Sequence, residues 1–162
     1  MQPHPNVRAV QAALAGADAR DGAGAPSVVR LLPEAVHTAA AAAGALGVDV
    51  GAIANSLVFE ADGAPLLVLT SGAHRVDTAE LAATLGFTRL RRATPEFVRE
   101  HTGQVIGGVA PVGHPRPLRT LVDTALQGYD EIWAAGGVPQ AVFPTTYADL
   151  LRITGGDPTE VA

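Results

Sequence analysis

The stretch IANSLVFEADGAPLLVLT, residues 53–70, decides the fold of this chain. It contains two apolar runs, Asn55 to Ala61 and Pro65 to Thr70, on either side of the sequence ADGA. An Asp-Gly pair between two apolar runs is typical of a tight β-hairpin turn. The stretch therefore predicts two antiparallel strands. The first strand is entered through Asn55 and Ser56, whose side chains need hydrogen-bond partners if they are buried.

Helix signals surround this hairpin. Asp77 and Glu80 have the spacing of a capping box, and so do Thr146 and Asp149. Thr94 precedes a proline that suits the first helical position. Helices are expected at residues 6–20, 38–47, 77–86 and 94–103, and a fifth begins at residue 146. Further strands are expected at residues 27–32, 87–90, 119–126, 130–137 and 140–144, and residues 103–117 are expected to be irregular.

These elements follow one another without the regular alternation of a doubly wound parallel sheet. We therefore expect an α+β fold in which a mixed, mostly antiparallel sheet of six or seven strands is surrounded by about five helices. The chain is 48% hydrophobic and only 17% charged, which argues against disorder. No linker or repeat divides it, so residues 1–162 are expected to form a single domain.

The missing residue types exclude several kinds of chemistry. The chain has no cysteine, and all eleven of its basic residues are arginine. A thiol nucleophile, a phosphate-loop lysine and a Schiff-base lysine are therefore excluded. None of the three serines lies in a nucleophile-elbow sequence, and the five histidines lack metal-ligand spacing. We expect no metal and no cofactor.

The sequence gives weaker indications of where the protein is located in the cell and of what it binds. No apolar run approaches the ~20 residues that span a bilayer, and neither a secretory signal nor a cysteine suggests export. The expectation is a cytoplasmic protein with no membrane association. A net charge of −5 is unusual for a protein that wraps DNA, so no DNA partner is expected. Arg89, Arg91, Arg92 and Arg99 form either a solvated face balanced by nearby glutamates or a local phosphate-contacting patch.

Two glycine-rich segments are candidate ligand loops. GGVAPVG covers residues 107–113, and AAGGVPQA covers residues 134–141, after an expected strand. Glycine lets main-chain N–H groups approach a ligand closely, and Pro111 stiffens the first loop. Neither segment has the spacing of a dinucleotide fingerprint. Each could be an ordinary turn, but two such loops in one small domain indicate main-chain recognition of a compact polar group.

From His37 to the C-terminus, the chain resembles the YbaK/prolyl-tRNA-synthetase-associated family of aminoacyl-tRNA editing domains. The resemblance rests on pieces that occur in the order of the family. These pieces are HTAAAAAGALGV, IANSLVFEADGAPLLVL, VDTAELAATLGFTRLRRATPEFVREHTG, GGVAPVG, LVDTAL, EIWAAGG and YADLLRITGG. The chain looks like a free-standing member of this family.

The resemblance implies a trans-editing hydrolase that removes a small amino acid, such as Cys or Ala, from a mischarged tRNA, here expected to be tRNA-Pro. The implied partners are the 3′ acceptor end of the aminoacyl-tRNA and, as a further candidate, prolyl-tRNA synthetase. Glycine-loop N–H groups and the ribose hydroxyl of the substrate would assist hydrolysis. Asn55, Gly108 and Pro111 are the expected catalytic residues. Substrate binding is expected from His37, Ser56, Gly107, Val109, Ala110, Gly113, Ala135, Gly136 and Gly137.

One position departs from the family. Most members carry lysine at the start of the core strand, in KSLVF, where this chain has Asn55. An asparagine donates hydrogen bonds but carries no charge, and a charge-assisted bond is roughly twice as strong as a neutral one. Two alternatives follow. Either an arginine elsewhere supplies the charge, or the chain is a weakly active or inactive member that binds tRNA or a synthetase.

Overall fold

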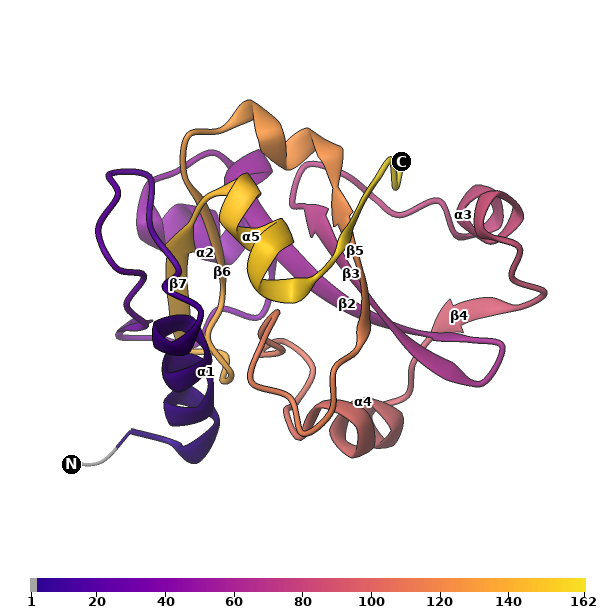
Figure 1. Ribbon diagram of the computed structural model, residues 1–162, viewed down its shortest axis with the longest axis horizontal. Coiled ribbons are helices and arrows are strands. Elements are labelled where there is room, and N and C mark those ends of the chain that lie inside the picture. Colours follow the sequence, from indigo (N-terminus) through magenta and orange to yellow (C-terminus); the bar gives the residue numbers. More distant parts are fainter. Residues whose placement is uncertain (1–2) are drawn as a thin grey trace.

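The two strands joined by Asp62 and Gly63 lie in the middle of the sheet, and their turn lies toward one end of the molecule (Figure 1). In the computed structural model, which describes residues 3–162, β2 (Ile53–Ala61) pairs antiparallel with β3 (Ala64–Ser71). Asp62 and Gly63 have φ values of 50° and 89°, which the mirror-image turn of a two-residue hairpin requires. The predicted hairpin is confirmed. Met1 and Gln2, which belong to the expected 1–162 domain, lie outside the described residues.

The sheet is mixed, as expected. Within residues 3–162 it has eight strands, one more than the six or seven predicted, in the order β1-β7-β6-β2-β3-β5-β8, with β4 paired to β2. β2–β6, β3–β5 and β5–β8 are parallel, and the other four pairings are antiparallel. The remaining strands are β1 (Arg30–Leu31), β4 (Leu90–Arg92), β5 (Arg119–Asp123), β6 (Ile132–Ala135), β7 (Ala141–Thr145) and β8 (Asp157–Thr159).

The last four α-helices begin and end where the local signals place them. Side chains of Thr38, Asp77, Thr94 and Thr146 each accept a main-chain hydrogen bond at a helix N-terminus. The helices that they cap each end at a glycine in the left-handed conformation. The α-helices are α1 (Pro5–Gly16), α2 (Ala39–Leu46), α3 (Thr78–Leu85), α4 (Pro95–Thr102) and α5 (Tyr147–Thr154).

Several expected boundaries are wrong, including those of the strand expected at 27–32, which is only Arg30–Leu31. The first helix ends at Gly16 instead of residue 20, and the strand expected at 87–90 lies at β4. The strand expected at 119–126 stops at Asp123, because the Asp123 carboxylate accepts from the N–H of Ala125 and caps a short 3₁₀ helix, η2 (Thr124–Gly128). A second 3₁₀ helix, η1 (Val50–Ala52), precedes β2.

Helices cover both faces of the sheet. Ile53 and Ala54 are successive residues of β2 and therefore point to opposite faces. Ile53 packs in a cluster with Ala42 of α2, whereas Ala54 packs in the cluster that contains Leu150 of α5. Figure 1 accordingly shows α5 in front of the sheet and α2 behind it. No helix in the described part of the chain is long and apolar enough to cross a membrane.

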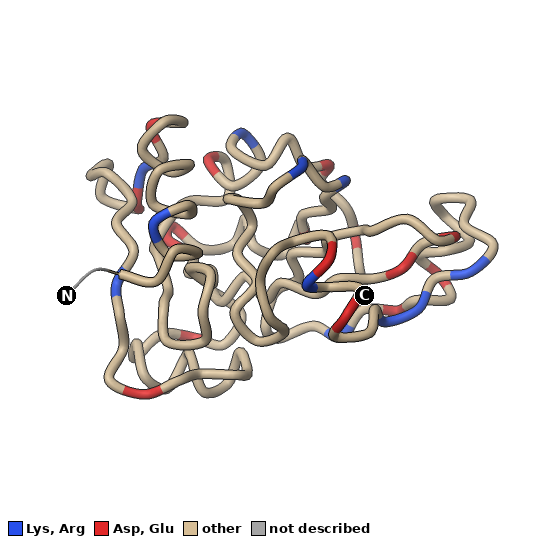
Figure 2. The backbone as a smooth tube through the Cα atoms, turned by 90° about the horizontal axis from the view of Figure 1, so that it is seen from below, with Lys and Arg blue, Asp and Glu red and all other residues tan. Residues whose placement is uncertain are grey.

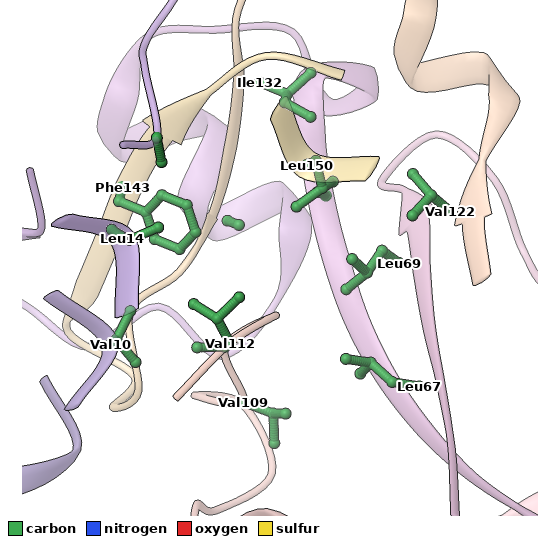
Figure 3. Close-up of a cluster of buried hydrophobic side chains, with 14 of the residues drawn as sticks. Val10, Leu14, Leu67, Leu69, Val109, Val112, Val122, Ile132, Phe143 and Leu150 are labelled. Atoms are coloured by element: carbon green, nitrogen blue, oxygen red, sulfur yellow. The ribbon is translucent and has the colours of Figure 1, made fainter. Parts of the chain in front are cut away.

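The main core holds an irregular segment in place. Residues 103–118 contain neither helix nor strand, as predicted. Val109 and Val112 from this segment are nevertheless buried in the largest core cluster, where Figure 3 shows them beside Val10, Leu67 and Phe143. Close packing in protein interiors makes such anchoring stiff. The first glycine loop is therefore fixed to the core through its valines.

Candidate functional site

An edge gap in the sheet exposes the middle of β2. β6 pairs with β2 only at Ile53 and Ala54, and β4 pairs with it only from Phe59 to Ala61. In the described residues, the intervening positions 55–58 therefore have a strand neighbour on the β3 side alone. The gap lies at the polar entrance of β2 that was singled out in the sequence.

The main chain of Ser56 faces this gap. In an antiparallel pair, successive residues turn their N–H and C=O groups to alternate sides. The carbonyl of Ile53 accepts from Gly72 on the β3 side, whereas the carbonyl of Val58 accepts from Ala93 on the other side. Ser56 has the same parity as Val58, and the register of the pair is continuous. Its main-chain polar groups consequently point toward the gap.

A pocket of about 270 Å³ occupies this region. Its walls come from α2, the β2 gap, β6, β7, Arg92 of β4 and the loop around Gly107. Most of the lining side chains are apolar, and the polar groups are few, as in small-molecule sites generally. The apolar part consists of Val36, Ala39, Ala42, Ile53, Ala54, Leu57, Ile106, Val109, Trp133, Ala134, Ala135, Pro139, Ala141 and Val142.

The structure brings six of the expected site residues to this pocket. They are His37, Asn55, Ser56, Gly107, Val109 and Ala135. The other six do not line it, and two of them, Gly113 and Gly137, instead approach Val10 and Asn6 of α1. The six are Gly108, Ala110, Pro111, Gly113, Gly136 and Gly137.

Gly108 connects the two glycine loops. A Cβ at this position would lie 2.6 Å from the carbonyl carbon of Val138 and 2.8 Å from the nitrogen of Pro139. Only a glycine permits this approach, because main-chain atoms cannot yield as a flexible side chain would. The N–H of Gly108 donates to the carbonyl of Val105 at 3.0 Å. Gly108 therefore positions the loop, and its N–H is already bonded.

A buried amide holds the centre of the same loop. The N–H of Ala110 donates to Oε1 of Gln104 at 2.7 Å, and Gln104 is fully buried. The Ala110 carbonyl lies 2.7 Å from Nε2 of His114, so that nitrogen carries the proton and donates. Both main-chain polar groups of Ala110 are thus bonded within the protein. Neither is available to a ligand.

Two loop residues that line the pocket, Gly107 and Val109, have N–H groups without a hydrogen-bond partner in the described chain. Gly107 has a φ of +91°, a conformation that side-chain-bearing residues rarely adopt, and it abuts His37. The free N–H groups therefore alternate with the bonded N–H groups of Gly108 and Ala110.

Two polar side chains of β2 also lack partners. The half-buried amide of Asn55 forms no hydrogen bond with the described residues, and it points to the face of the sheet that carries α2. Ser56 points to the opposite face, and its Oγ is shielded from solvent without a hydrogen-bond partner in the described residues. Because the pocket spans the sheet edge, side chains from both faces line it.

Arg92 brings a positive charge to the pocket. It pairs with Phe59 in the β2–β4 register, and its guanidinium lies 5.8 Å from the centre of the Phe59 ring. The neighbouring Arg91 points to the other side of β4 and binds Glu60 at 3.2 Å. Figure 2 shows basic and acidic positions interspersed at this end of the molecule. Of the arginines in the described chain, only Arg92 lines the pocket.

Burial affects one titratable group near the loop. Desolvation lowers the pKa of the His114 imidazole below its ordinary value of 6.5, and the hydrogen bond to the Ala110 carbonyl partly opposes this shift. His114 is therefore held neutral near pH 7. A neutral ring donates one hydrogen bond through Nε2, which is the bond that fixes Ala110.

Some lining residues were missed in the sequence. Arg92 was considered only as a member of an arginine cluster, and Ile106 and Trp133 were not considered. Arg92 reaches the pocket through the long-range β2–β4 pairing, for which no local pattern exists. Ile106 could have been noticed as an apolar residue just before a glycine pair; it remains 47% exposed at the pocket.

Known proteins share both the sequence pattern and the fold. A model of the aminoacyl-tRNA editing domain matches residues 33–153. A proline–tRNA ligase of Nitratidesulfovibrio vulgaris (strain DP4) is 33% identical over 133 residues, which cover 75% of this chain and 23% of that ligase. The chain thus spans less than a quarter of the length of this relative.

Two further relatives are closer to this chain in length. The protein YwhH of Bacillus subtilis (strain 168) is 31% identical over 110 residues, which cover 67% of this chain and 69% of YwhH. The crystal structure of a proposed trans-editing enzyme for prolyl-tRNA synthetase matches with a TM-score of 0.87 at 42% identity. That match covers 99% of this chain and 98% of the solved one.

Proposed function

Because the chain belongs to the family of aminoacyl-tRNA editing domains, we propose that it is a hydrolase that cleaves the ester bond of a mischarged tRNA. The observation that carries this proposal is the pair of free N–H groups of Gly107 and Val109 on a rigid loop that lines the pocket. The substrate would be a small amino acid, such as Cys or Ala, on tRNA-Pro, because proline–tRNA ligases are among the relatives.

The two free N–H groups fit the chemistry of ester hydrolysis. When water adds to the ester carbonyl, negative charge develops on the carbonyl oxygen, and fixed donors stabilise it. Losing one such donor typically raises the barrier by about 3 kcal/mol. Gly107 and Val109 are the donors in this proposal. Gly108 and Pro111, expected from the sequence to be catalytic, instead shape the loop, and so do Ala110 and Gly113.

The size of the pocket favours a small aminoacyl group. Its volume of about 270 Å³ is slightly below the roughly 300–1,000 Å³ of ordinary ligand pockets. Ile53, Trp133 and Val142 pack together in one buried cluster, so the apolar wall that they form is stiff. A bulky amino acid would have to displace these side chains. This supports an amino acid of the size of Cys or Ala.

Arg92 supplies a charge that Asn55 lacks. The acceptor end of a tRNA carries a phosphate on each nucleotide, and a guanidinium binds phosphate through directed hydrogen bonds. Asn55, which lines the same pocket, would then donate a neutral hydrogen bond. This supports the first of the two alternatives raised by the sequence, in which an arginine elsewhere replaces the charge.

Charged tRNAs test the proposal directly. The protein would be incubated with tRNA-Pro carrying Cys, Ala or Ser, and release of the amino acid would be followed over time. We expect one of the small amino acids to be released faster than it is from the uncatalysed tRNA. If none is released, the hydrolase proposal is wrong, and retained binding of the tRNA would then favour a binding module.

A further inference from the structure

A small recess opens from the main pocket beside Ser56. It has a volume of about 20 Å³ and shares six of its nine lining residues with the pocket. The three additional lining residues are Val58, Ala93 and Val98, of which Val58 and Val98 belong to the main core cluster. A space of at least ~10–15 Å³ is needed to hold one water molecule. The recess therefore has room for a single water.

Polar groups at the recess suit a water. The Ser56 Oγ is buried and has no hydrogen-bond partner among the described residues. Gly107, which has no side chain, and Val109 line the same recess. Buried waters typically form about three hydrogen bonds, and they occur where buried polar groups are otherwise unpaired. An unpaired buried hydroxyl destabilises the folded protein unless something in the functional state satisfies it.

We propose that this recess holds the water that attacks the aminoacyl ester, and that Ser56 orients that water. The proposal rests on the proposed function. The Ser56 hydroxyl accepts a hydrogen bond from the water, which leaves a lone pair of the water free to point into the main pocket. Ser56 is therefore a catalytic residue through its contact with the attacking water, and it forms no covalent bond with the substrate.

The reaction balances with water as the only co-reactant. The water oxygen forms a bond to the ester carbonyl carbon, and the carbonyl electron pair moves onto its oxygen. When this intermediate collapses, the bond between the carbon and the ribose oxygen breaks, and the ribose oxygen keeps the electron pair. One proton of the water passes through the neighbouring ribose hydroxyl to that oxygen. The other proton leaves the new carboxylic acid for solvent.

Ser56→Ala separates this role from a structural one. The protein gives the Ser56 hydroxyl no partner, so its removal costs at most the bond to the water, and we expect thermal stability to change little. The water loses its orienting partner, so the single-turnover rate of deacylation should fall by about 100-fold, the effect of misplacing a reactant by about 1 Å. The dissociation constant for uncleaved tRNA should not change. Loss of activity without loss of stability is not what a structural serine would give.

A matched control is Ser27→Ala. Ser27 Oγ is also buried and unpaired in the described chain, but Ser27 does not line the pocket or the recess. We expect its removal to leave the deacylation rate unchanged. Ser56→Thr adds a second test, since it keeps the hydroxyl while its extra methyl group competes for the recess. Its activity should stay low.

The outcomes distinguish the two proposals. If the wild-type protein releases amino acid and Ser56→Ala does so at the same rate, the water site is wrong and the hydrolase proposal stands. The water site is also wrong if Ser56→Ala is markedly destabilised or if Ser56→Thr is fully active. If the wild-type protein releases no amino acid from any charged tRNA, the hydrolase proposal fails, and the water site fails with it.

Discussion

The side-chain Oε1 of Gln104 accepts the main-chain N–H of Ala110 at 2.7 Å, inside the protein. This bond joins the start of the irregular 103–118 segment to its middle. Together with the bond from Gly108 to Val105, it determines which N–H groups of the loop are used internally. The free donors of the pocket therefore depend on a glutamine that does not line it.

Replacing Gln104 with leucine should disturb this loop. The variant leaves the N–H of Ala110 buried without a partner, so we expect the free energy of unfolding to fall by about 1–3 kcal/mol. The deacylation rate should fall as well, because the Gly107 and Val109 donors lose their fixed positions. Chemical denaturation and single-turnover kinetics measure the two effects. Gln127→Leu, a change at an exposed glutamine of η2, is the control and should alter neither.

Gly108→Ala should separate the two glycine loops. The new methyl group would lie 2.6–2.8 Å from main-chain atoms of Val138 and Pro139, so the loops must move apart. Overpacking of this kind destabilises proteins by about 1–3 kcal/mol. The matched control is Gly44→Ala in α2, where nothing lies within 4 Å of the new atom. It should stabilise by about 0.5–1 kcal/mol, because alanine suits a helix better. Equal thermal shifts in both variants would contradict the close packing at Gly108.

Lowering the pH should reduce the free energy of unfolding through protonation of His114. Its pKa is lowered in the folded state, so the unfolded chain takes up this proton more readily as the pH falls below about 6.5. Stability due to neutral His114 is thus present above that pH and lost below it. His114→Gln can still donate to the Ala110 carbonyl but does not titrate there. Its unfolding free energy should fall less between pH 7 and 5.5 than that of the wild type. His101→Gln, which leaves His114 in place, should behave as the wild type does.

Local signals in the sequence were sufficient for the elements closest to the hairpin. The Asp62-Gly63 turn and the capping residues Asp77 and Thr94 act within a few residues, and all were predicted correctly. The long apolar runs of β2 and β3 were equally clear. The family resemblance is confirmed. Asn55 and Ser56 had already been noticed as polar residues at the start of an apolar strand, and the resemblance gave them their expected roles.

Long-range contacts account for what the sequence did not reveal. β8 has three residues, one of them Pro158, and it exists because it pairs in parallel with β5. Arg92 enters the pocket through a pairing between residues that lie far apart in the chain. In the glycine loop, the resemblance to the family's loop drew attention to Gly108. Which N–H groups are free depends instead on internal bonds that no glycine pattern encodes.

Asn55→Ala tests the rim of the pocket. If the amide of Asn55 donates a hydrogen bond to the bound acceptor end, its removal should lower kcat/KM by about 5- to 10-fold, equivalent to the ~1 kcal/mol of a neutral hydrogen bond. Its stability should not change, because the amide has no partner in the described protein.

Asn55→Lys restores the residue that most family members carry. Since Arg92 already provides a cation, we expect no gain in kcat/KM; a rise would identify the chain as a weakened relative.

Arg92→Ala should weaken tRNA binding in a salt-dependent manner. Each phosphate contact of a cationic side chain contributes to the slope of log K against log salt, by about 0.7 for a single strand. We expect the slope for uncleaved charged tRNA to decrease by about that amount and KM to rise, with a smaller change in kcat. Arg91→Ala removes the adjacent arginine of β4, which is paired with Glu60 and does not line the pocket, so it should leave the slope nearly unchanged. Equal slopes for Arg92→Ala and the wild type would exclude Arg92 as the phosphate contact and return the missing charge of Asn55 to an unidentified residue.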